Sequence, residues 1–188
     1  TIAPAFPLRL PAAPAVAGDP ALVLSGSTGW WPNRAAQQWF LARVLPALRA
    51  AGVPGCLHIY GGAPVDAAGV VWHRAPEDAI DAFPEGAIAV IPLQVGSGIR
   101  MRILEAWARG LAVVASPTAA AGLAVVSGRE LLIADTPAAF VAAIQRLQTD
   151  PGLRERLIAG GRAYLARHHD PETQTRLLLA RYVSVTPG

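Results

Sequence analysis

Residues 87–115 read AIAVIPLQVGSGIRMRILEAWARGLAVVA, and they predict a strand, a glycine-rich loop, a helix and a second strand. The apolar runs 87–91 and 111–115 have the length and composition of buried strands. Between them, four apolar residues recur at the spacing with which an amphipathic helix covers a sheet, namely Ile99, Ile103, Ala106 and Trp107. This stretch therefore predicts one βαβ unit of an α/β protein.

The loop in this unit has the features of a phosphate site. Gly96, Ser97 and Gly98 let the backbone approach a ligand closely, and the helix that begins at Ile99 directs free N–H groups and its positive dipole end toward the loop. Arg100 and Arg102 can add charge-assisted hydrogen bonds. Glu105, further along the helix, could accept hydrogen bonds from two vicinal hydroxyls such as those of a ribose.

The same charged residues also fit a second interpretation. Arg102, Glu105 and Arg109 stand at i, i+3 and i+4 spacings, which is typical of an ion-pair stripe on a solvated helix face. A Gly-Ser-Gly sequence is likewise common in plain turns between a strand and a helix. Spacing alone leaves both interpretations open.

The rest of the chain repeats the alternation of strands and helices. We expect strands at residues 21–24, 57–60, 70–72, 87–91, 111–115 and 130–134. Helices are expected at 32–51, 77–83, from 99 onward, and at 137–148, 150–167 and 171–182, with residues 116–122 as a loop. This order predicts an α/β fold with a Rossmann-like, doubly wound parallel sheet.

Ligands bind such sheets outside the carboxyl ends of the strands. Three loops leave those ends with unusual content, at 25–33, 73–78 and 94–98. A Gly-x-Gly-x-x-Gly fingerprint is absent after the first strand, which disfavours a nicotinamide cofactor, and no Gly-Lys-Ser/Thr sequence indicates a Walker-type site. No Asp-x-Asp triplet is present to hold a metal against a diphosphate, and His168-His169 are too isolated to predict a metal site.

Composition supports a globular protein. The 188 residues are 53% hydrophobic, carry a formal charge of +3, and include no apolar run of the 18 or more residues that a membrane span needs. A signal peptide is not recognisable, and the single Cys56 cannot form an internal disulfide. We therefore expect a soluble, cytoplasmic protein, and the scattered arginines do not indicate a nucleic-acid partner.

The ordered set of motifs resembles the C-terminal, nucleotide-sugar-binding domain of the group 1 retaining glycosyltransferases, enzymes of the two-domain GT-B architecture. The resemblance covers roughly residues 22–170. The shared pieces are Leu24-Ser25-Gly26, Pro32-Asn33, Trp39-Phe40, Val44-Leu45-Pro46, His73-Arg74-Ala75-Pro76, Pro92-Leu93, Val95-Gly96-Ser97-Gly98, Arg100, Arg102, Leu104-Glu105-Ala106, Gly110, Glu130, Ile133-Ala134-Asp135, Phe140, Asp150-Pro151, Leu153-Arg154 and Gly161-Arg162.

The resemblance implies a role for each loop. The diphosphate of a UDP- or GDP-sugar would contact Gly96, Ser97, Gly98, Ile99, Arg100 and Arg102. Glu105 would bind the ribose, and Ser25 and Gly26 would lie near the phosphates. The base would meet the loop of His73, Arg74, Ala75 and Pro76. The family transfers the sugar to an acceptor hydroxyl with retained configuration, and neither a metal nor another cofactor is expected.

Two departures from the family bear on catalysis. Many relatives have a glutamate where this chain has Ser97, and an acid where it has Ala121. The catalytic residues are therefore left unassigned. A non-catalytic relative that binds a nucleotide sugar remains an alternative, and a sugar-nucleotide epimerase of the same architecture is a weaker one.

The proline-rich residues 1–20 are predicted to be a linker, and residues 21–188 the nucleotide-sugar-binding domain. The N-terminal acceptor domain of the family has no counterpart in the sequence, so this chain alone should bind nucleotide but transfer nothing. The acceptor would be a glycan or a lipid-linked sugar bound by that domain, and the resemblance leaves room for peripheral membrane association of the full-length protein. Three placements stay open for Trp30, Trp31 and Trp107. These side chains could pack in the core, face the acceptor domain, or contact the ligand.

Overall fold

The computed structural model describes residues 3–27, 29–96 and 101–185. At its centre is a six-stranded parallel sheet in the order β3-β2-β1-β4-β5-β6. The strands are β1 (Leu22–Gly26), β2 (Leu57–Gly61), β3 (Val70–His73), β4 (Ile88–Ile91), β5 (Ala112–Ala115) and β6 (Leu132–Ile133). The chain builds outward from β1 to one edge and then from β4 to the other. The predicted doubly wound parallel sheet is confirmed.

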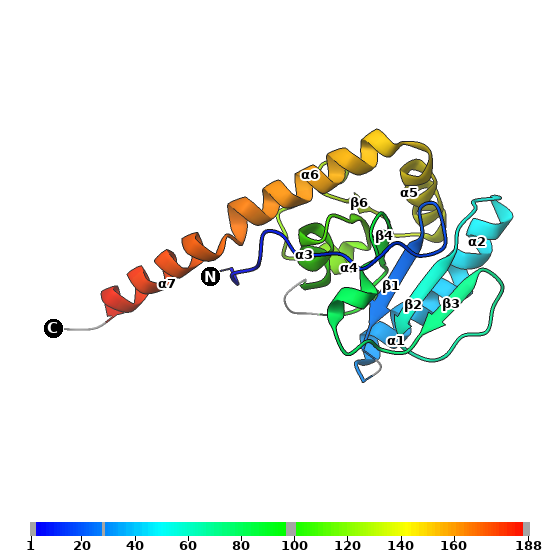
Figure 1. Ribbon diagram of the computed structural model, residues 1–188, viewed down its shortest axis with the longest axis horizontal. Helices are drawn as coiled ribbons and strands as arrows, with labels where there is room; N and C mark the ends of the chain where they lie inside the picture. The colour runs from blue at the N-terminus through cyan, green and yellow to red at the C-terminus, as the bar shows by residue number, and fades with distance from the viewer. Residues whose placement is uncertain (1–2, 28, 97–100, 186–188) are drawn as a thin grey trace.

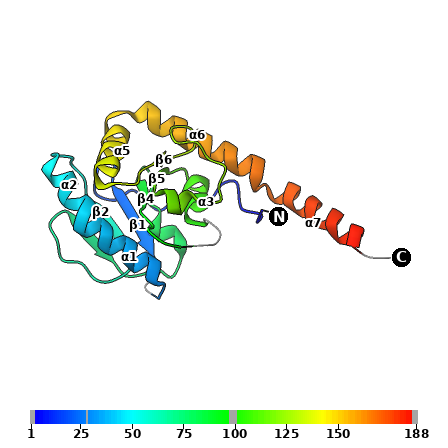
Figure 2. The same cartoon turned by 180° about the vertical axis from the view of Figure 1, so that it is seen from behind.

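Helices cover both faces of the sheet (Figures 1 and 2). One face carries α1 (Trp31–Trp39), the π-helical turn η1 (Phe40–Val44), α2 (Leu45–Ala50) and α5 (Pro137–Thr149). The other carries the short 3-10 helix η2 (Ala79–Ala82), α3 (Met101–Ala108) and α4 (Pro117–Ala120). The long α6 (Pro151–His168) contributes to the cores on both sides, and α7 (Pro171–Val185) follows it.

The central strands are apolar on both sides because both faces are covered. In β1, Leu22 and Leu24 pack into the core beneath η1 and α5, whereas Val23 packs into the core beneath α3. The same alternation continues in β4 and β5. Successive strand residues point to opposite faces, so each of these strands supplies both cores and reads as a continuous apolar run.

The helix expected at 32–51 is interrupted by a π-helical turn. At its end, the Leu45 N–H bonds to the carbonyl of Phe40, five residues back. Pro46 follows directly and has no N–H to donate to the preceding turn. The missing donor gives a physical reason why the regular hydrogen-bond ladder does not run through this point.

The expected loop at 116–122 is wrong in part, because α4 forms within it. The Ser116 hydroxyl oxygen accepts a hydrogen bond from the Ala119 N–H at 3.1 Å, and Pro117 occupies the first helical position. This is a common pattern for the start of a helix. The small residues concealed the helix from an interpretation based on apolar periodicity.

Residues 3–20 contain no helix and lie against the domain. The Phe6 N–H donates to the His169 carbonyl, and the Leu10 N–H donates to the Ala108 carbonyl at the end of α3. The Phe6 side chain is buried in the same core as α3. Figure 1 shows this segment crossing α3, whereas α7 extends away from the body. On α7, Leu177, Leu178 and Leu179 are exposed.

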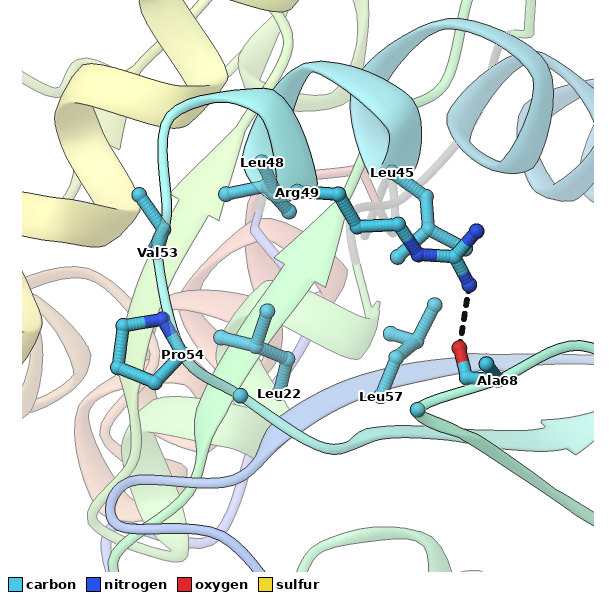
Figure 3. A pocket seen from close by; sticks show the side chains of 10 residues that line it. Leu22, Leu45, Leu48, Arg49, Val53, Pro54, Leu57 and Ala68 are labelled. Carbon is cyan, nitrogen blue, oxygen red and sulfur yellow. Dashed lines mark hydrogen bonds between the residues drawn. The ribbon is translucent and has the colours of Figure 1, made fainter.

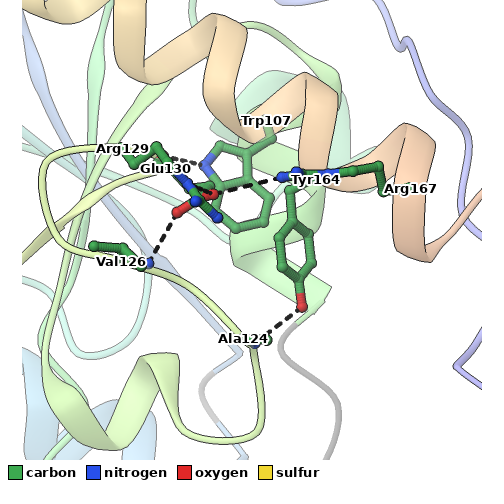
Figure 4. Close-up of polar contacts among 7 residues, drawn as sticks. All are labelled: Trp107, Ala124, Val126, Arg129, Glu130, Tyr164 and Arg167. Atoms are coloured by element: carbon green, nitrogen blue, oxygen red, sulfur yellow. Dashed lines mark hydrogen bonds and ion pairs between the residues drawn. The ribbon is translucent and has the colours of Figure 1, made fainter.

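Trp107 anchors α3 in the core and is fully buried. Its indole N–H donates to the Glu130 carbonyl at 3.0 Å, and Tyr164 of α6 packs beside it (Figure 4). Gly161 of α6 lies so close that a Cβ there would be 2.2 Å from the indole Cδ1. Of the three open placements for this tryptophan, core packing is therefore the one observed.

We expect Gly161→Ala to lower the free energy of unfolding by about 2 kcal/mol, because a buried indole cannot move aside without disturbing its neighbours. A fall of about 4–8 °C in the melting temperature, followed by circular dichroism, would accompany this loss. Gly152→Ala in the same helix is the matched control, since its Cβ would meet only the ends of the Arg156 and Asp150 side chains at 3.3 Å. Equal melting of both variants would contradict the packing argument.

Candidate functional site

The strand order reverses between β1 and β4, and this switch point forms a crevice at the carboxyl edge of the sheet. The chain leaves β1 for α1 on one face and leaves β4 for α3 on the other. Loops from both strands consequently border the crevice. These two loops, at 25–33 and 94–98, are among the three that were singled out in the sequence.

The ends of β1 and β2 approach closely beside the crevice. Gly26 and Gly61 are partners in the strand register, and Gly61 has a φ of +80°. A Cβ on Gly61 would lie 2.3 Å from the Gly26 carbonyl oxygen. Only glycine fits this position, and the close approach brings the loops after β1, β2 and β3 together.

A pocket of about 230 Å³ opens at this edge. Six of its lining residues are predicted site residues from the end of β1, the loop after β3 and helix α3, namely Ser25, Gly26, Ala75, Pro76, Arg102 and Glu105. The others are Ser27, Tyr60, Ala79, Ala82 and Phe83. Sequence reasoning missed Tyr60, although its place at the carboxyl end of a predicted strand could have indicated it. The structure therefore gathers most of the described candidate residues in one place.

Glu105 lines the pocket and is also ion-paired. Its Oε1 accepts hydrogen bonds from Arg109 Nε at 3.1 Å and Nη2 at 2.8 Å. Arg109 bonds further to the Pro11 carbonyl and lies over the Phe83 ring, and its side chain is only 7% exposed. The pair predicted by the stripe interpretation exists, but the solvated helix face is wrong. The segment around Pro11 and the Phe83 ring shield the arginine.

Arg102 contributes a positively charged side chain to the lining of the pocket. Burial lowers the pKa of its guanidinium from the ordinary value, while the Glu105 carboxylate opposes that shift. A guanidinium remains protonated in proteins despite such shifts. Arg102 therefore brings a partly desolvated positive charge to the pocket, where its attraction for an anion is weakly screened.

The histidine of the predicted base-contacting loop is engaged within the protein. His73 Nε2 lies 2.9 Å from His58 Nδ1, and its ring stacks on Tyr60 at 4.2 Å. His58 Nε2 lies 2.9 Å from the Ala17 carbonyl and donates to it; in the neutral ring His58 Nδ1 then accepts and His73 Nε2 donates. Burial, and then the neighbouring His58, lower the pKa of His73. Ala75 and Pro76, rather than the His73 ring or the exposed Arg74, line the pocket.

The start of the glycine loop lies next to an aromatic side chain. A Cβ on Gly96, whose φ is +145°, would be 3.3 Å from the indole Cη2 of Trp30. Trp30 is 41% exposed and Trp31 is 58% exposed. The remaining predicted diphosphate contacts, Ser97, Gly98, Ile99 and Arg100, lie outside the described residues.

A second pocket, of about 300 Å³, lies at the other end of the strands, where β1 and β2 begin (Figure 3). Leu22 and Leu57, the first residues of β1 and β2, are part of its lining, together with Leu45, Leu48 and Val53. The Arg49 guanidinium donates to the Ala68 carbonyl beside it. This amino edge is not where doubly wound sheets bind ligands, so the carboxyl edge is the candidate site.

No cluster of three or more His, Cys, Asp or Glu side chains suited to a metal occurs in residues 3–27, 29–96 and 101–185. Over the same part of the chain, no helix combines the length and the apolar character needed to cross a membrane.

The family described as "Glycosyl transferases group 1" matches residues 19–150, well over half of the chain. No curated protein sequence gives a significant match.

Solved structures share the fold. Sucrose-phosphate synthase (tll1590) from Thermosynechococcus elongatus is 19% identical with a TM-score of 0.73, covering 98% of this chain and 52% of that one. TarM of S. aureus is 14% identical with a TM-score of 0.74, covering 96% and 38%. Anabaena HepE, solved in complex with UDP, is 14% identical with a TM-score of 0.68, covering 89% and 50%. This chain thus spans about half or less of the length of these proteins.

Proposed function

Because the chain belongs to the group 1 glycosyltransferases, we propose that it is the donor-binding domain of a retaining enzyme that uses a UDP- or GDP-sugar. The observation that supports this most directly is the meeting of Gly26, Arg102 and Glu105 in one pocket at the switch point of the sheet. HepE, which shares the fold, was solved with UDP and with UDP-glucose. The acceptor would be a hydroxyl of a glycan, polysaccharide or glycolipid.

The proposal assigns each part of the nucleotide to a group in or beside the pocket. Glu105 is proposed to accept hydrogen bonds from the two ribose hydroxyls, and its pairing with Arg109 through Oε1 would hold the carboxylate in position. The base would lie against Ala75, Pro76 and Tyr60, where backbone groups and apolar surface are available. The diphosphate would lie toward Gly96 and the start of α3, which offers the positive end of its dipole.

The chemistry assigned to this domain is departure of the diphosphate. The bond from the anomeric carbon to the diphosphate oxygen breaks, and the nucleoside diphosphate leaves with the bonding electrons. The acceptor oxygen takes its place with the same anomeric configuration, and the proton of the acceptor hydroxyl passes to the departing diphosphate. Arg102, Arg100 and the dipole of α3 would stabilise the developing negative charge, so no metal is included in the proposal.

The acceptor site is proposed to lie in a second domain. This chain spans about half of sucrose-phosphate synthase and of HepE. The recognition of the acceptor, and any association of the whole protein with a membrane surface, would then depend on residues beyond those of the donor pocket.

A second candidate is a non-catalytic relative that binds a nucleotide sugar. Ala121, directly after α4, favours it because many relatives carry an acid at the corresponding position. The two candidates differ in turnover and not in binding. Assaying the full-length protein for hydrolysis of, or transfer from, UDP-glucose and GDP-mannose separates them, since only an active enzyme releases nucleoside diphosphate.

Calorimetric titration of the chain with UDP, GDP, UDP-glucose and GDP-mannose tests the proposed site. We expect one of the two nucleoside diphosphate series to bind at a single site, with equal affinity in the presence of EDTA or Mg²⁺. NAD is the control, because the fingerprint that binds it is absent. Lack of binding by both series would refute the donor-site proposal, and dependence on Mg²⁺ would refute its metal-free form.

A further inference from the structure

Trp30 lies at the switch point of the sheet. It stands directly before α1, and its carbonyl accepts a hydrogen bond from the Asn33 N–H at 3.0 Å. Asn33 is buried, and its side-chain amide donates to the carbonyl and the hydroxyl of Ser27, each at 3.3 Å. Asn33 thus links Ser27, directly after β1, to Trp30 at the start of α1, and the backbone that carries the indole is tied to both elements.

The indole rests on Gly96. Both Cη2 and Cζ2 of Trp30 are close to Gly96, at 3.3 and 3.7 Å from where a Cβ would stand. Any larger residue at 96 would press on the ring. The indole nevertheless keeps 41% of its surface exposed, although tryptophan is usually well buried. A supported but open aromatic ring at a ligand crevice is suited to contact a bound molecule.

The order of groups along a nucleotide sugar determines which part reaches Trp30. With the ribose at Glu105 and the diphosphate between the start of α3 and Gly96, the next group continues away from Glu105, past Gly96 and toward Trp30. The group attached there is the sugar that is transferred. From this geometry we infer that the Trp30 indole forms a wall of the sugar subsite and packs against the sugar ring. The inference rests on the proposed function and assigns a residue to its donor specificity.

Two interactions favour the packing of a sugar ring against the indole. One face of a hexose ring presents mainly C–H groups, whose weak positive charge complements the negative face of an aromatic ring. The contact also removes apolar area from water. The bare nucleoside diphosphate lacks the hexose ring and makes no such contact. Trp30 should therefore affect the affinity for a nucleotide sugar and not that for its nucleoside diphosphate.

The test compares Trp30→Ala, Trp30→Phe and Trp31→Ala with the unaltered chain by calorimetry, using UDP with UDP-glucose and GDP with GDP-mannose. Trp31 is the matched control because it is adjacent and even more exposed. For the nucleotide series that binds, Trp30→Ala should weaken the sugar-bearing ligand about five- to tenfold and leave the nucleoside diphosphate within twofold. Trp30→Phe should retain most of the affinity, and Trp31→Ala should change neither ligand.

Other results overturn the inference. Equal weakening of both ligands would mean that Trp30 supports the phosphate loop, and tighter binding by Trp30→Ala would mean that the indole obstructs the site. Unchanged affinity for both ligands would remove Trp30 from the site. In these three cases the proposed function stands, because nucleotide still binds. If the unaltered chain binds neither series, the proposed function fails and this inference fails with it.

Discussion

Replacing Glu105 by alanine should lower the affinity of the chain for its nucleoside diphosphate about a hundredfold. The two hydrogen bonds proposed from the ribose hydroxyls to the carboxylate are charge-assisted, and losing both costs about 3 kcal/mol. The carboxylate lines the pocket, so the loss is local to the ligand. Calorimetry with UDP or GDP measures it. An affinity within threefold of the unaltered chain would exclude the ribose role.

The variant Arg109→Gln is the control that separates an effect of Glu105→Ala on nucleotide binding from an effect on folding. Both variants lose the ion pair between Glu105 and Arg109, but Arg109 is not among the residues that line the pocket. Arg109→Gln also loses contacts with the Pro11 carbonyl and the Phe83 ring, so it should lose at least as much thermal stability as Glu105→Ala, whereas only Glu105→Ala should lose most of its nucleotide affinity. If both lose affinity equally, the pair acts through the shape of α3 and the carboxylate need not touch the ligand.

A ligand lacking one hydroxyl gives an independent measurement. 2′-Deoxy-UDP, or 2′-deoxy-GDP, should bind the unaltered chain about tenfold more weakly than the ribonucleotide, because one charge-assisted bond is missing. In Glu105→Ala the deoxy and ribose forms should bind alike. The two changes remove the same interaction, so their effects should not add. Additive losses would place the hydroxyl against another residue.

The second large effect is expected at Glu130, whose carboxylate is fully buried (Figure 4). Arg129 Nε contacts its Oε1 at 2.5 Å, Arg167 Nη2 lies 3.6 Å from the same oxygen, and the Val126 N–H donates to Oε2 at 2.9 Å. The double variant Arg129→Ala/Arg167→Ala would leave a buried charge with one backbone donor. We expect a loss of about 3 kcal/mol in the free energy of unfolding, measured by urea denaturation.

Two controls identify the cause of that loss. Adding Glu130→Gln to the double variant removes the unpaired charge and should restore part of the stability, because a neutral amide is less costly to bury. Arg176→Ala breaks a pair with Glu172 in which both side chains are mostly exposed, and it should cost no more than about 0.5 kcal/mol. Should the double variant be no less stable than Arg176→Ala, water must compensate the Glu130 carboxylate.

The fold was predictable because its signals are local. The runs 87–91 and 111–115 are apolar at every position, which a strand buried on both faces requires, and the helix between them carries an apolar stripe. The residues at which these elements begin and end were established only by the structure. The start of α4 shows this: its Ser116 cap and Pro117 were visible in the sequence, but small residues give no apolar periodicity.

The candidate site was predicted in its parts and not in its contacts. Ser25, Ala75 and Glu105 were singled out from two loops and a helix that are distant in the sequence, and the sheet brings them to one pocket. The position of Tyr60 and the engagement of His73 by His58 depend on neighbouring strands, β2 and β3, whose register no local pattern specifies. One of the two open interpretations placed Arg109 on a solvated face. The segment around Pro11 that shields this arginine is almost a hundred residues earlier in the chain, so local spacing could not reveal it.

By itself, the sequence determined the alternation of strands and helices, the doubly wound parallel class and the family, since these follow from periodicity and from motifs in order. The tertiary structure decided what each polar side chain meets: Glu105 with Arg109 beside the pocket, His73 with His58, and Trp30 on Gly96. The physical reason is range. Backbone conformation responds to the nearest few residues, whereas the charge, burial and partners of a side chain depend on segments that only folding brings together.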